Sequence, residues 1–329
     1  MSKIRVGFIG CGNVATRHAL WLLKIPEAQI VALCDIDPGA FERLYQRVPG
    51  LVPDLPRFSD YRQMLDTVEL DAVQVLTPHT LHFEHITNSL ERGLHVLVEK
   101  PMVCTSEQAR AVIEAKDRAG KAVVVSYQRR YQENFRFIRD LLNDGPMGKV
   151  QYVSGLLGQD WLNLFRNTWR HDPGLSGGGQ INDSGSHLLD IVMWATGARP
   201  QNVYASMEYF DAPVDINTAL TARCEDGVLL NLAIVGNGAE WRDEITFWAE
   251  NGVIYYRDGQ VTAKLRNQEA ELIPPAGPDP DNPARNFIAA CLGDEPVKSP
   301  PEDALKVALF TETIWRSAQT GSPQTVAWD

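Results

Sequence analysis

The fold is decided near the start of the chain by the stretch Ile4-Arg5-Val6-Gly7-Phe8-Ile9-Gly10-Cys11-Gly12-Asn13-Val14-Ala15. A buried strand pattern runs into a G-x-G-x-x-A loop that opens a helix, which is the context that a dinucleotide-binding loop requires. Gly10 permits the tight turn, Gly12 lets a pyrophosphate approach the backbone, and Ala15 is small enough to fit between helix and sheet. The N-terminus of the helix after this loop would offer unsatisfied N–H groups to the phosphates, and Asn13 and Val14 are further candidate cofactor contacts.

The rest of the first 125 residues alternates short apolar runs with amphipathic stretches. Runs rich in Val, Ile and Leu without polar alternation indicate parallel strands buried on both faces. These runs are Ile4–Ile9, Ile30–Cys34, Ala72–Leu76, Val96–Val98 and Val123–Val125. Helical spacing fills the intervals at Ala15–Lys24, Pro38–Arg47, Phe83–Arg92 and Ser106–Ala119. Strand and helix in alternation predict right-handed βαβ units, and hence an N-terminal Rossmann domain over residues 1–125.

The pattern changes after Gly148, where several strand-like runs alternate apolar with polar residues. Asp-Gly and Asn-Gly pairs separate some of them, as in β-hairpins. The runs are Lys149–Leu157, Asn202–Phe210, Leu220–Cys224, Val228–Val235, Glu244–Ala249 and Val253–Tyr256. We expect a C-terminal α+β domain over residues 126–329, with a large open, mainly antiparallel sheet and a helix Ile181–Ala195 on one face. Two late helices, Asn282–Cys291 and Glu302–Ala318, are free to pack back on the Rossmann domain.

The composition excludes several classes of protein. With 329 residues, 44% of them hydrophobic and 22% charged, the chain is globular and large enough for two domains. A formal net charge of −11 argues against binding to nucleic acid, which needs a basic surface. No apolar run approaches the ~20 residues that span a bilayer, and the first residues enter a strand directly, without space for a signal peptide. We therefore expect a cytoplasmic protein, with no membrane partner, whose five scattered cysteines are thiols.

Asp35 ends the second strand and bears on the choice of dinucleotide. A carboxylate at this place accepts hydrogen bonds from the adenosine ribose and repels a 2′-phosphate. Ile36 and Asp37 follow, so the neighbouring residues provide no cation for that phosphate. A helix N-cap is the other interpretation, but Asp37 before Pro38 fits that task better. The sequence favours NAD over NADP.

Two further segments carry chemistry. Glu99-Lys100-Pro101 follows an apolar run, so Lys100 should lie at the carboxyl edge of the Rossmann sheet, where ligands bind. Later comes Gly177-Gly178-Gly179-Gln180-Ile181-Asn182-Asp183-Ser184-Gly185-Ser186-His187. Asp183 and His187 are four residues apart, which on one helix would place them on one face, where a carboxylate can orient an imidazole. The glycines would let the backbone approach a ligand. A fortuitous helical ion pair or a core histidine remains the alternative from spacing alone.

In this order, the glycine loop, E-K-P and G-G-G-x-x-x-D-x-G-x-H resemble the Gfo/Idh/MocA family of NAD(P)-dependent sugar and polyol oxidoreductases over nearly the whole chain. The resemblance implies that Lys100, Asp183 and His187 are catalytic, and that Glu99 and Lys100 also contact the cofactor. It further implies that Thr77, Pro78 and His82, in a T-P-x-x-x-H segment, line the cofactor. His79, His82 and His85 lack the carboxylate companion and spacing of a metal site, so we expect no metal.

The expected reaction transfers a hydride between nicotinamide and a secondary alcohol or ketone of a sugar, cyclitol or derivative. His187 would act as general base with Asp183 orienting it, and Lys100 would hydrogen-bond the reacting oxygen. Positive charge on the nicotinamide would favour a neutral Lys100, so either Lys100 or His187 can carry the proton. Polar donors beside flat aromatic rings suit a sugar, and the remaining candidate substrate contacts are Tyr127, Arg129, Trp161, Trp169 and Arg170. Plain core packing is the alternative for the tryptophans.

Two other functions remain open from the sequence. An NAD-dependent glycosidase would use transient oxidation to cleave a glycosidic bond, and a regulatory protein would sense NAD without chemistry. The resemblance also implies a homodimer or homotetramer formed through the C-terminal sheet. The apolar positions that we expect on its uncovered face are Val203, Leu220, Leu230, Leu232 and Phe247.

Overall fold

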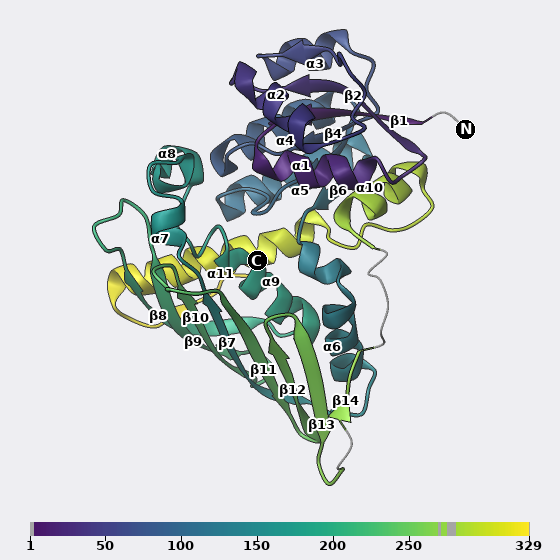
Figure 1. Ribbon diagram of the computed structural model, residues 1–329. Coiled ribbons are helices and arrows are strands. Elements are labelled where there is room, and N and C mark those ends of the chain that lie inside the picture. Colours follow the sequence, from purple (N-terminus) through teal and green to yellow (C-terminus); the bar gives the residue numbers. More distant parts are fainter. Residues whose placement is uncertain (1–2, 269–270, 275–280, 329) are drawn as a thin grey trace. The chain divides into compact units, whose positions relative to one another are not determined.

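The Rossmann sheet is present in the structure, a computed structural model that describes residues 3–268, 271–274 and 281–328. Its six described strands are all parallel and lie in the order β3-β2-β1-β4-β5-β6. They are β1 (Ile4–Ile9), β2 (Ala28–Cys34), β3 (Arg57–Phe58), β4 (Ala72–Val75), β5 (His95–Val98) and β6 (Val123–Val125). Figure 1 labels β1, β2, β4 and β6 of this sheet. The strand order reverses between β1 and β4, and ligands of such sheets bind beyond the carboxyl ends at this point.

Helices cover this sheet, and their ends follow local sequence signals. They are α1 (Asn13–Leu22), α2 (Pro38–Arg47), α3 (Tyr61–Thr67), α4 (His82–Glu91) and α5 (Ser106–Ala119). Thr105 caps α5 by accepting the Gln108 N–H, and Gly120 ends it with a φ of 61°. The expected strands and helices are confirmed to within two residues at each end. The sequence did not indicate β3 and α3, because a strand of two residues gives no apolar run.

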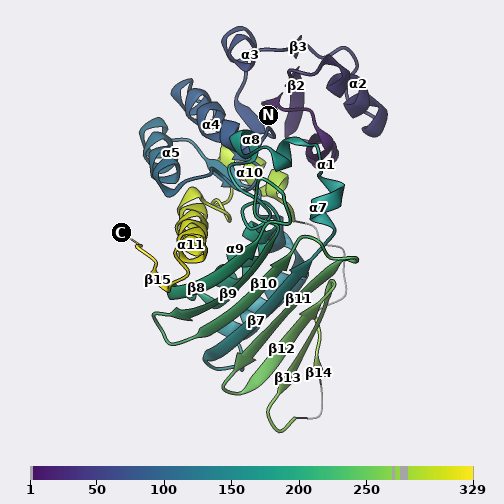
Figure 2. The ribbon, with the colours of Figure 1, turned by 90° about the vertical axis from the view of Figure 1, so that its left-hand side faces the viewer.

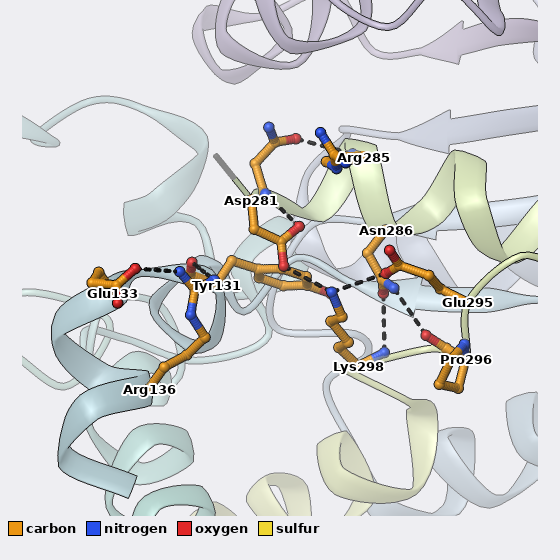
Figure 3. A network of polar contacts seen from close by, with 10 residues as sticks. Tyr131, Glu133, Arg136, Asp281, Arg285, Asn286, Glu295, Pro296 and Lys298 are labelled. Atoms are coloured by element: carbon orange, nitrogen blue, oxygen red, sulfur yellow. Dashed lines mark hydrogen bonds and ion pairs between the residues drawn. The ribbon is translucent and has the colours of Figure 1, made fainter. Parts of the chain in front are cut away.

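The chain divides into two compact units, one of which combines residues up to Gln128 with the late segment Asp281–Leu305. In that segment, α10 (Pro283–Leu292) shares one hydrophobic core with α1 and α2. Lys298 ties the segment together, because its Nζ lies 2.9 Å from both Asp281 Oδ2 and Glu295 Oε2 (Figure 3). Asn286 adds two bonds, since its Nδ2 donates to Pro296 O and its Oδ1 accepts the Lys298 N–H.

The second unit, Arg129–Pro280 with Lys306–Asp329, contains a larger sheet. The order of its nine described strands is β14-β13-β12-β11-β7-β10-β9-β8-β15, and every neighbouring pair is antiparallel except β7 and β10. The strands are β7 (Val150–Gly158), β8 (Pro200–Glu208), β9 (Asn217–Cys224), β10 (Leu229–Val235), β11 (Arg242–Ala249), β12 (Gly252–Arg257), β13 (Gln260–Leu265), β14 (Glu271–Leu272) and β15 (Gln324–Thr325). The mainly antiparallel sheet is therefore confirmed.

Helices pack on one face of this sheet and leave the other open, as Figure 2 shows. They are α6 (Glu133–Asn143), α9 (Gly185–Thr196) and α11 (Pro301–Thr320). The short helical turns of the chain are η1 (His79–Leu81), η2 (Gln128–Tyr131), α7 (Trp161–Leu164), η3 (Trp169–His171) and α8 (Pro173–Ser176) among the described residues. A Cβ added to Gly155 would lie 2.9 Å from Leu232 and 3.1 Å from Leu188 of α9. Gly155 and Leu232 therefore face the helices.

The prediction of which apolar side chains lie on the open face was wrong. Val203, Leu220, Leu230, Leu232 and Phe247 are all at most 4% exposed. Leu232 pairs with Leu220 across β10 and β9, so both belong to the face that α9 covers. The open face carries the alternate residues instead. Its larger apolar members include Tyr152, Tyr204, Leu229 and Trp248, which are 37–46% exposed.

The structure also bears on membrane insertion. In the part of the chain that is described, no helix combines the length and the apolar character needed to cross a bilayer.

His85 makes the stability of the first unit depend on pH. Its ring packs against Tyr61, with centroids 4.3 Å apart, and burial lowers the pKa of His85 to about 4. In the unfolded chain this pKa is about 6.5, so protonation favours unfolding and stability is lost as the pH falls from about 6.5 towards 4. We expect this site to lower the free energy of unfolding by about 2 kcal/mol between pH 7 and pH 5, measured by urea denaturation.

His85→Gln isolates this contribution, because an amide can still bond the Thr77 hydroxyl that lies 3.0 Å from His85 Nδ1 but cannot titrate. The variant should lose less stability than the parent over the same pH interval. If the unfolding free energies of the parent and of His85→Gln changed equally with pH, His85 would not be the source of this pH dependence.

Candidate active site

The loop after β1 has room for a dinucleotide. Gly10 has a φ of 97°, and a Cβ there would lie 2.7 Å from the Leu76 carbonyl group, so the position requires glycine. A Cβ on Gly12 would meet no atom of the described residues within 4 Å. Gly12 is also the N-cap of α1 and has no side chain to cap the helix, so the first N–H groups of α1 remain available to an anion. Ala15 is fully buried at the helix–sheet contact.

Asp35 is fixed beside this loop. Its Oδ2 accepts the Cys11 N–H at 2.7 Å and its Oδ1 accepts the Asp37 N–H at 2.8 Å. Ile36, which the sequence analysis did not single out, is 88% exposed next to this carboxylate. The signal that could have found Ile36 was its apolar side chain directly after the acidic residue that follows the strand.

Three further candidate segments follow strands of the same sheet. Thr77 and Pro78 follow β4, Lys100 follows β5, and Tyr127 follows β6. The peptide bond between Lys100 and Pro101 is cis. Glu99 is 8% exposed and Tyr127 is 1% exposed, so both side chains lie within the protein, whereas Lys100 is half-buried. His82 is fully buried, with Nδ1 2.9 Å from Pro101 O and Nε2 2.8 Å from Thr77 O.

The second unit builds its candidate site around the carboxylate of Asp183, which is 4% exposed. The Nε1 of Trp161 donates to Asp183 Oδ2 at 2.9 Å, and the Nε of Arg170 donates to the same oxygen at 2.7 Å. The guanidinium of Arg170 lies 4.4 Å from the ring centroids of both Phe165 and Trp169. This arrangement fixes the Asp183 carboxylate and places the Arg170 cation over two aromatic rings.

Asp183 and His187 do not share a helix, contrary to the sequence prediction. The helix α9 begins at Gly185, so Asp183 lies in the preceding turn and half-buried His187 in the first helical turn. The cause is the carboxylate of Asp215, which accepts the N–H groups of Gly179 and Ile181 and the Nε1–H of Trp315. These bonds hold the glycine segment in a turn, so the helix begins only at Gly185.

Asp215 was missed by sequence reasoning. It is 3% exposed, and burial raises its pKa although three N–H donors oppose the shift. An acidic residue inside the apolar pair Val214 and Ile216 was the available signal. His171 was also missed as an individual residue. Its ring stacks on Trp161 with centroids 5.0 Å apart and an interplanar angle of 23°.

The two arginines after β6 are engaged within the second unit. Arg129 is 8% exposed, and its Nη2 donates to Asp243 Oδ2 at 2.8 Å. Tyr256 donates to the same oxygen, and burial raises the pKa of Asp243. Arg130 forms a buried ion pair with Asp190 of α9. These contacts give both guanidinium groups a structural task.

The described residues also bear on a metal site and on disulfides. They contain no group of three or more His, Cys, Asp or Glu that could hold a metal ion. All five cysteines lie in the described ranges and are free thiols.

Comparison with known proteins matches both parts of the chain. Residues 4–127 match the oxidoreductase family with an NAD-binding Rossmann fold, and residues 135–255 match the GFO/IDH/MocA C-terminal domain. Among curated relatives, D-glucoside 3-dehydrogenase of Escherichia coli K12 is 29% identical over 201 residues, which are 60% of this chain and 55% of that protein. Inositol 2-dehydrogenase of Arthrobacter sp. FB24 is 25% identical over 260 residues, which are 76% and 73% of the two chains.

A solved structure supports the fold. The WlbA dehydrogenase from Bordetella pertussis, in complex with NADH and UDP-GlcNAcA, superposes with a TM-score of 0.86 at 21% identity, covering 100% of this chain and 99% of that one. The chain spans little more than half the length of D-glucoside 3-dehydrogenase, so relatives alone do not assign its substrate. The two family models together cover most of the sequence, and the chain belongs to the Gfo/Idh/MocA oxidoreductase family.

Proposed function

We propose that this protein is an NAD-dependent oxidoreductase that transfers a hydride between nicotinamide and a secondary alcohol or ketone of a sugar, cyclitol or sugar derivative. The observation that carries the proposal is the position of Lys100, two residues after the end of β5, on the sheet edge where the Gly10–Gly12 loop, Asp35 and Thr77 also lie. The relatives named above act on a glucoside and an inositol by their names.

The first unit would hold the dinucleotide. Gly10, Gly12, Asn13, Val14 and Ala15 would place α1 against the pyrophosphate. Asp35 would accept hydrogen bonds from the adenosine ribose and Ile36 would pack on the adenine. Thr77, Pro78, Glu99 and Lys100 would lie along the nicotinamide half. His82 belongs to this set through its bonds to backbone carbonyls rather than through an exposed side chain.

Bound NAD⁺ supplies the acceptor for the hydride. The protein supplies the acid–base groups, with His187 removing the hydroxyl proton and Lys100 hydrogen-bonding the reacting oxygen. Trp161 and Arg170 both donate to Asp183 and fix its carboxylate, which would orient His187. Trp169 and Arg170 remain the better candidate substrate contacts. Trp161, Tyr127 and Arg129 are at most 8% exposed, and Arg129 is also paired with Asp243, so these three are the weaker members of the proposed set.

The activity is tested by measuring NADH formation against a panel of aldoses, cyclitols and sugar acids. Turnover of at least one compound is expected. Cleavage of a glycoside without net NADH would instead identify a glycosidase, and NADH binding without turnover of any compound would favour a sensor.

Cofactor choice should depend on Asp35. We expect a higher kcat/KM with NAD than with NADP, because the carboxylate repels the 2′-phosphate and Asp37 already holds the neighbouring cation of Arg43. Asp35→Ser should bring the ratio of kcat/KM with NAD to kcat/KM with NADP closer to one. Asp60→Ser is the control, since it removes one acidic N-cap of the same unit and should leave the ratio unchanged. Equal kcat/KM with NADP in the parent would contradict the proposal.

Turnover should depend on the proposed acid–base groups. Lys100→Ala and His187→Ala should each lower kcat by about 10²–10⁴-fold, the usual contribution of such groups. NADH affinity, measured by fluorescence titration, should stay within a few-fold because neither side chain holds the adenosine half. Lys121→Ala and His95→Gln are controls at the opposite edge of the sheet. Either catalytic variant with near-parental kcat would remove that residue from the mechanism.

We also propose that the open face of the second sheet forms a subunit interface. Tyr152 pairs with Leu229 on one side and with Trp248 on the other, so their side chains form an exposed apolar row. A monomer rarely exposes a large contiguous apolar patch, and closed symmetry makes a dimer or tetramer the simplest assembly.

Light scattering at micromolar concentration should therefore detect a dimer or tetramer. Trp248→Glu should shift it towards the monomer, because a charge would be buried in the interface. Val52→Glu, at an exposed apolar residue of the first unit, should not. A monomeric parent would refute the assembly, and an unchanged oligomer in Trp248→Glu would refute the interface.

A further inference from the structure

Lys100 lies between two residues that are each held by a buried histidine. Glu99 precedes it and bonds His18, and Pro101 follows it and bonds His82. We propose that His18 and His82 are positioning residues that hold Lys100 in place through the residues on either side of it. This inference rests on the proposed function, because it concerns how the group that would meet the reacting oxygen is fixed.

His18 acts from the helix that would carry the dinucleotide. It lies on the buried face of α1 with Ala15, Ala19 and Leu22, and it is fully buried. Its Nε2 lies 2.8 Å from Glu99 Oε1, and its Nδ1 lies 2.8 Å from Gln74 Oε1 on β4. His18 Nε2 and the Glu99 carboxylate therefore share a hydrogen bond inside the protein.

The carboxylate of Glu99 connects His18 to the segment that carries Lys100. Its second oxygen accepts the backbone N–H of Lys100 at 3.1 Å. One buried carboxylate therefore joins α1 to the peptide of Lys100. Helix α1 also begins at the glycine loop, so the segment that would hold the pyrophosphate and the segment that carries Lys100 share a direct polar connection.

His82 provides the second point of attachment. It is fully buried at the start of α4, and its two ring nitrogens face Pro101 O at 2.9 Å and Thr77 O at 2.8 Å. The ring thus bridges the end of β4 and the end of the E-K-P segment. Lys100 is constrained on both sides, while its own side chain is left half-buried.

A purely stabilising role explains this arrangement poorly. Buried charged and polar groups are costly unless fully paired, and apolar side chains of similar size often stabilise a core equally well. Here the two histidines bond Glu99 and Pro101, the residues on either side of Lys100. Rigid support for a reacting group is what a functional site requires, because a small displacement lowers the rate strongly.

The test compares His18→Phe, which fills the space but cannot donate, with His18→Gln, whose amide can still donate to Glu99. His95→Gln is the matched control. His95 is a histidine of the same sheet whose Nδ1 accepts the Ala122 N–H at the amino end of β5. Each folded variant is examined by competitive acetylation of Lys100 relative to Lys121, read by mass spectrometry, by NADH titration and by steady-state kinetics.

We expect His18→Phe to change the relative acetylation rate of Lys100 several-fold and to lower kcat by about 10- to 100-fold, the usual effect of losing a supporting contact. KM and NADH affinity should change far less. His18→Gln should restore most of the parental acetylation rate of Lys100 and most of the parental kcat. His82→Phe should show the same pattern as His18→Phe, because it releases Pro101.

The proposal is overturned if His18→Phe and His95→Gln give the same Lys100 acetylation and kcat, or if His18→Gln recovers nothing. The acetylation measurement does not depend on turnover. A parent protein that is inactive on every substrate would therefore count against the proposed function, while the change in Lys100 reactivity would still decide this inference.

Discussion

The close approach of Gly10 to the carbonyl group of Leu76 is the constraint on which the first unit depends. Because β1 and β4 are neighbours in the sheet, the chain leaving β1 must turn directly over the end of β4. A side chain on Gly10 would clash with that backbone at 2.7 Å. The turn lets α1 start beside the carboxyl edge of the sheet, and it brings His18, in the second turn of α1, against Gln74 and Glu99. One backbone conformation thus determines where both the anion-binding helix end and the Lys100 segment lie.

In the second unit, a buried carboxylate fixes the course of the backbone near the candidate site. Asp215 accepts two backbone N–H groups of the glycine segment and the indole N–H of Trp315 on α11. A Cβ on Gly179 would lie 2.0 Å from Asp215 O, so the segment can pass this strand connection only as glycine. The turn that results presents Asp183 to Trp161 and Arg170. The protein's own packing therefore explains why this segment contains glycine. Room for a ligand close to the backbone is a second explanation, and the two are compatible.

Much of the fold follows from the sequence because its signals are local. Buried parallel strands, the glycine loop and helix caps such as Thr105 depend on neighbouring residues, and they were located to within two residues. Long-range bonds were not accessible. The start of α9 depends on Asp215, which is distant in the chain, and α9 therefore begins at Gly185 rather than at Ile181. The alternation in β9 and β10 was visible, but its more apolar set belongs to the covered face, as antiparallel sheets generally require.

The same distinction applies to the candidate site. Motifs point to Lys100, Asp183 and His187, but their physical state depends on residues that carry no motif of their own. His18 belongs to no motif, and its contacts emerge only when the fold brings Gln74 of β4 and Glu99, which follows β5, to it. In each unit, fixed donors hold a carboxylate before any substrate arrives, and such preorganised charge needs no rearrangement during reaction. The donors to Glu99 and Asp183 are therefore as much a part of the site as the residues that would touch the substrate.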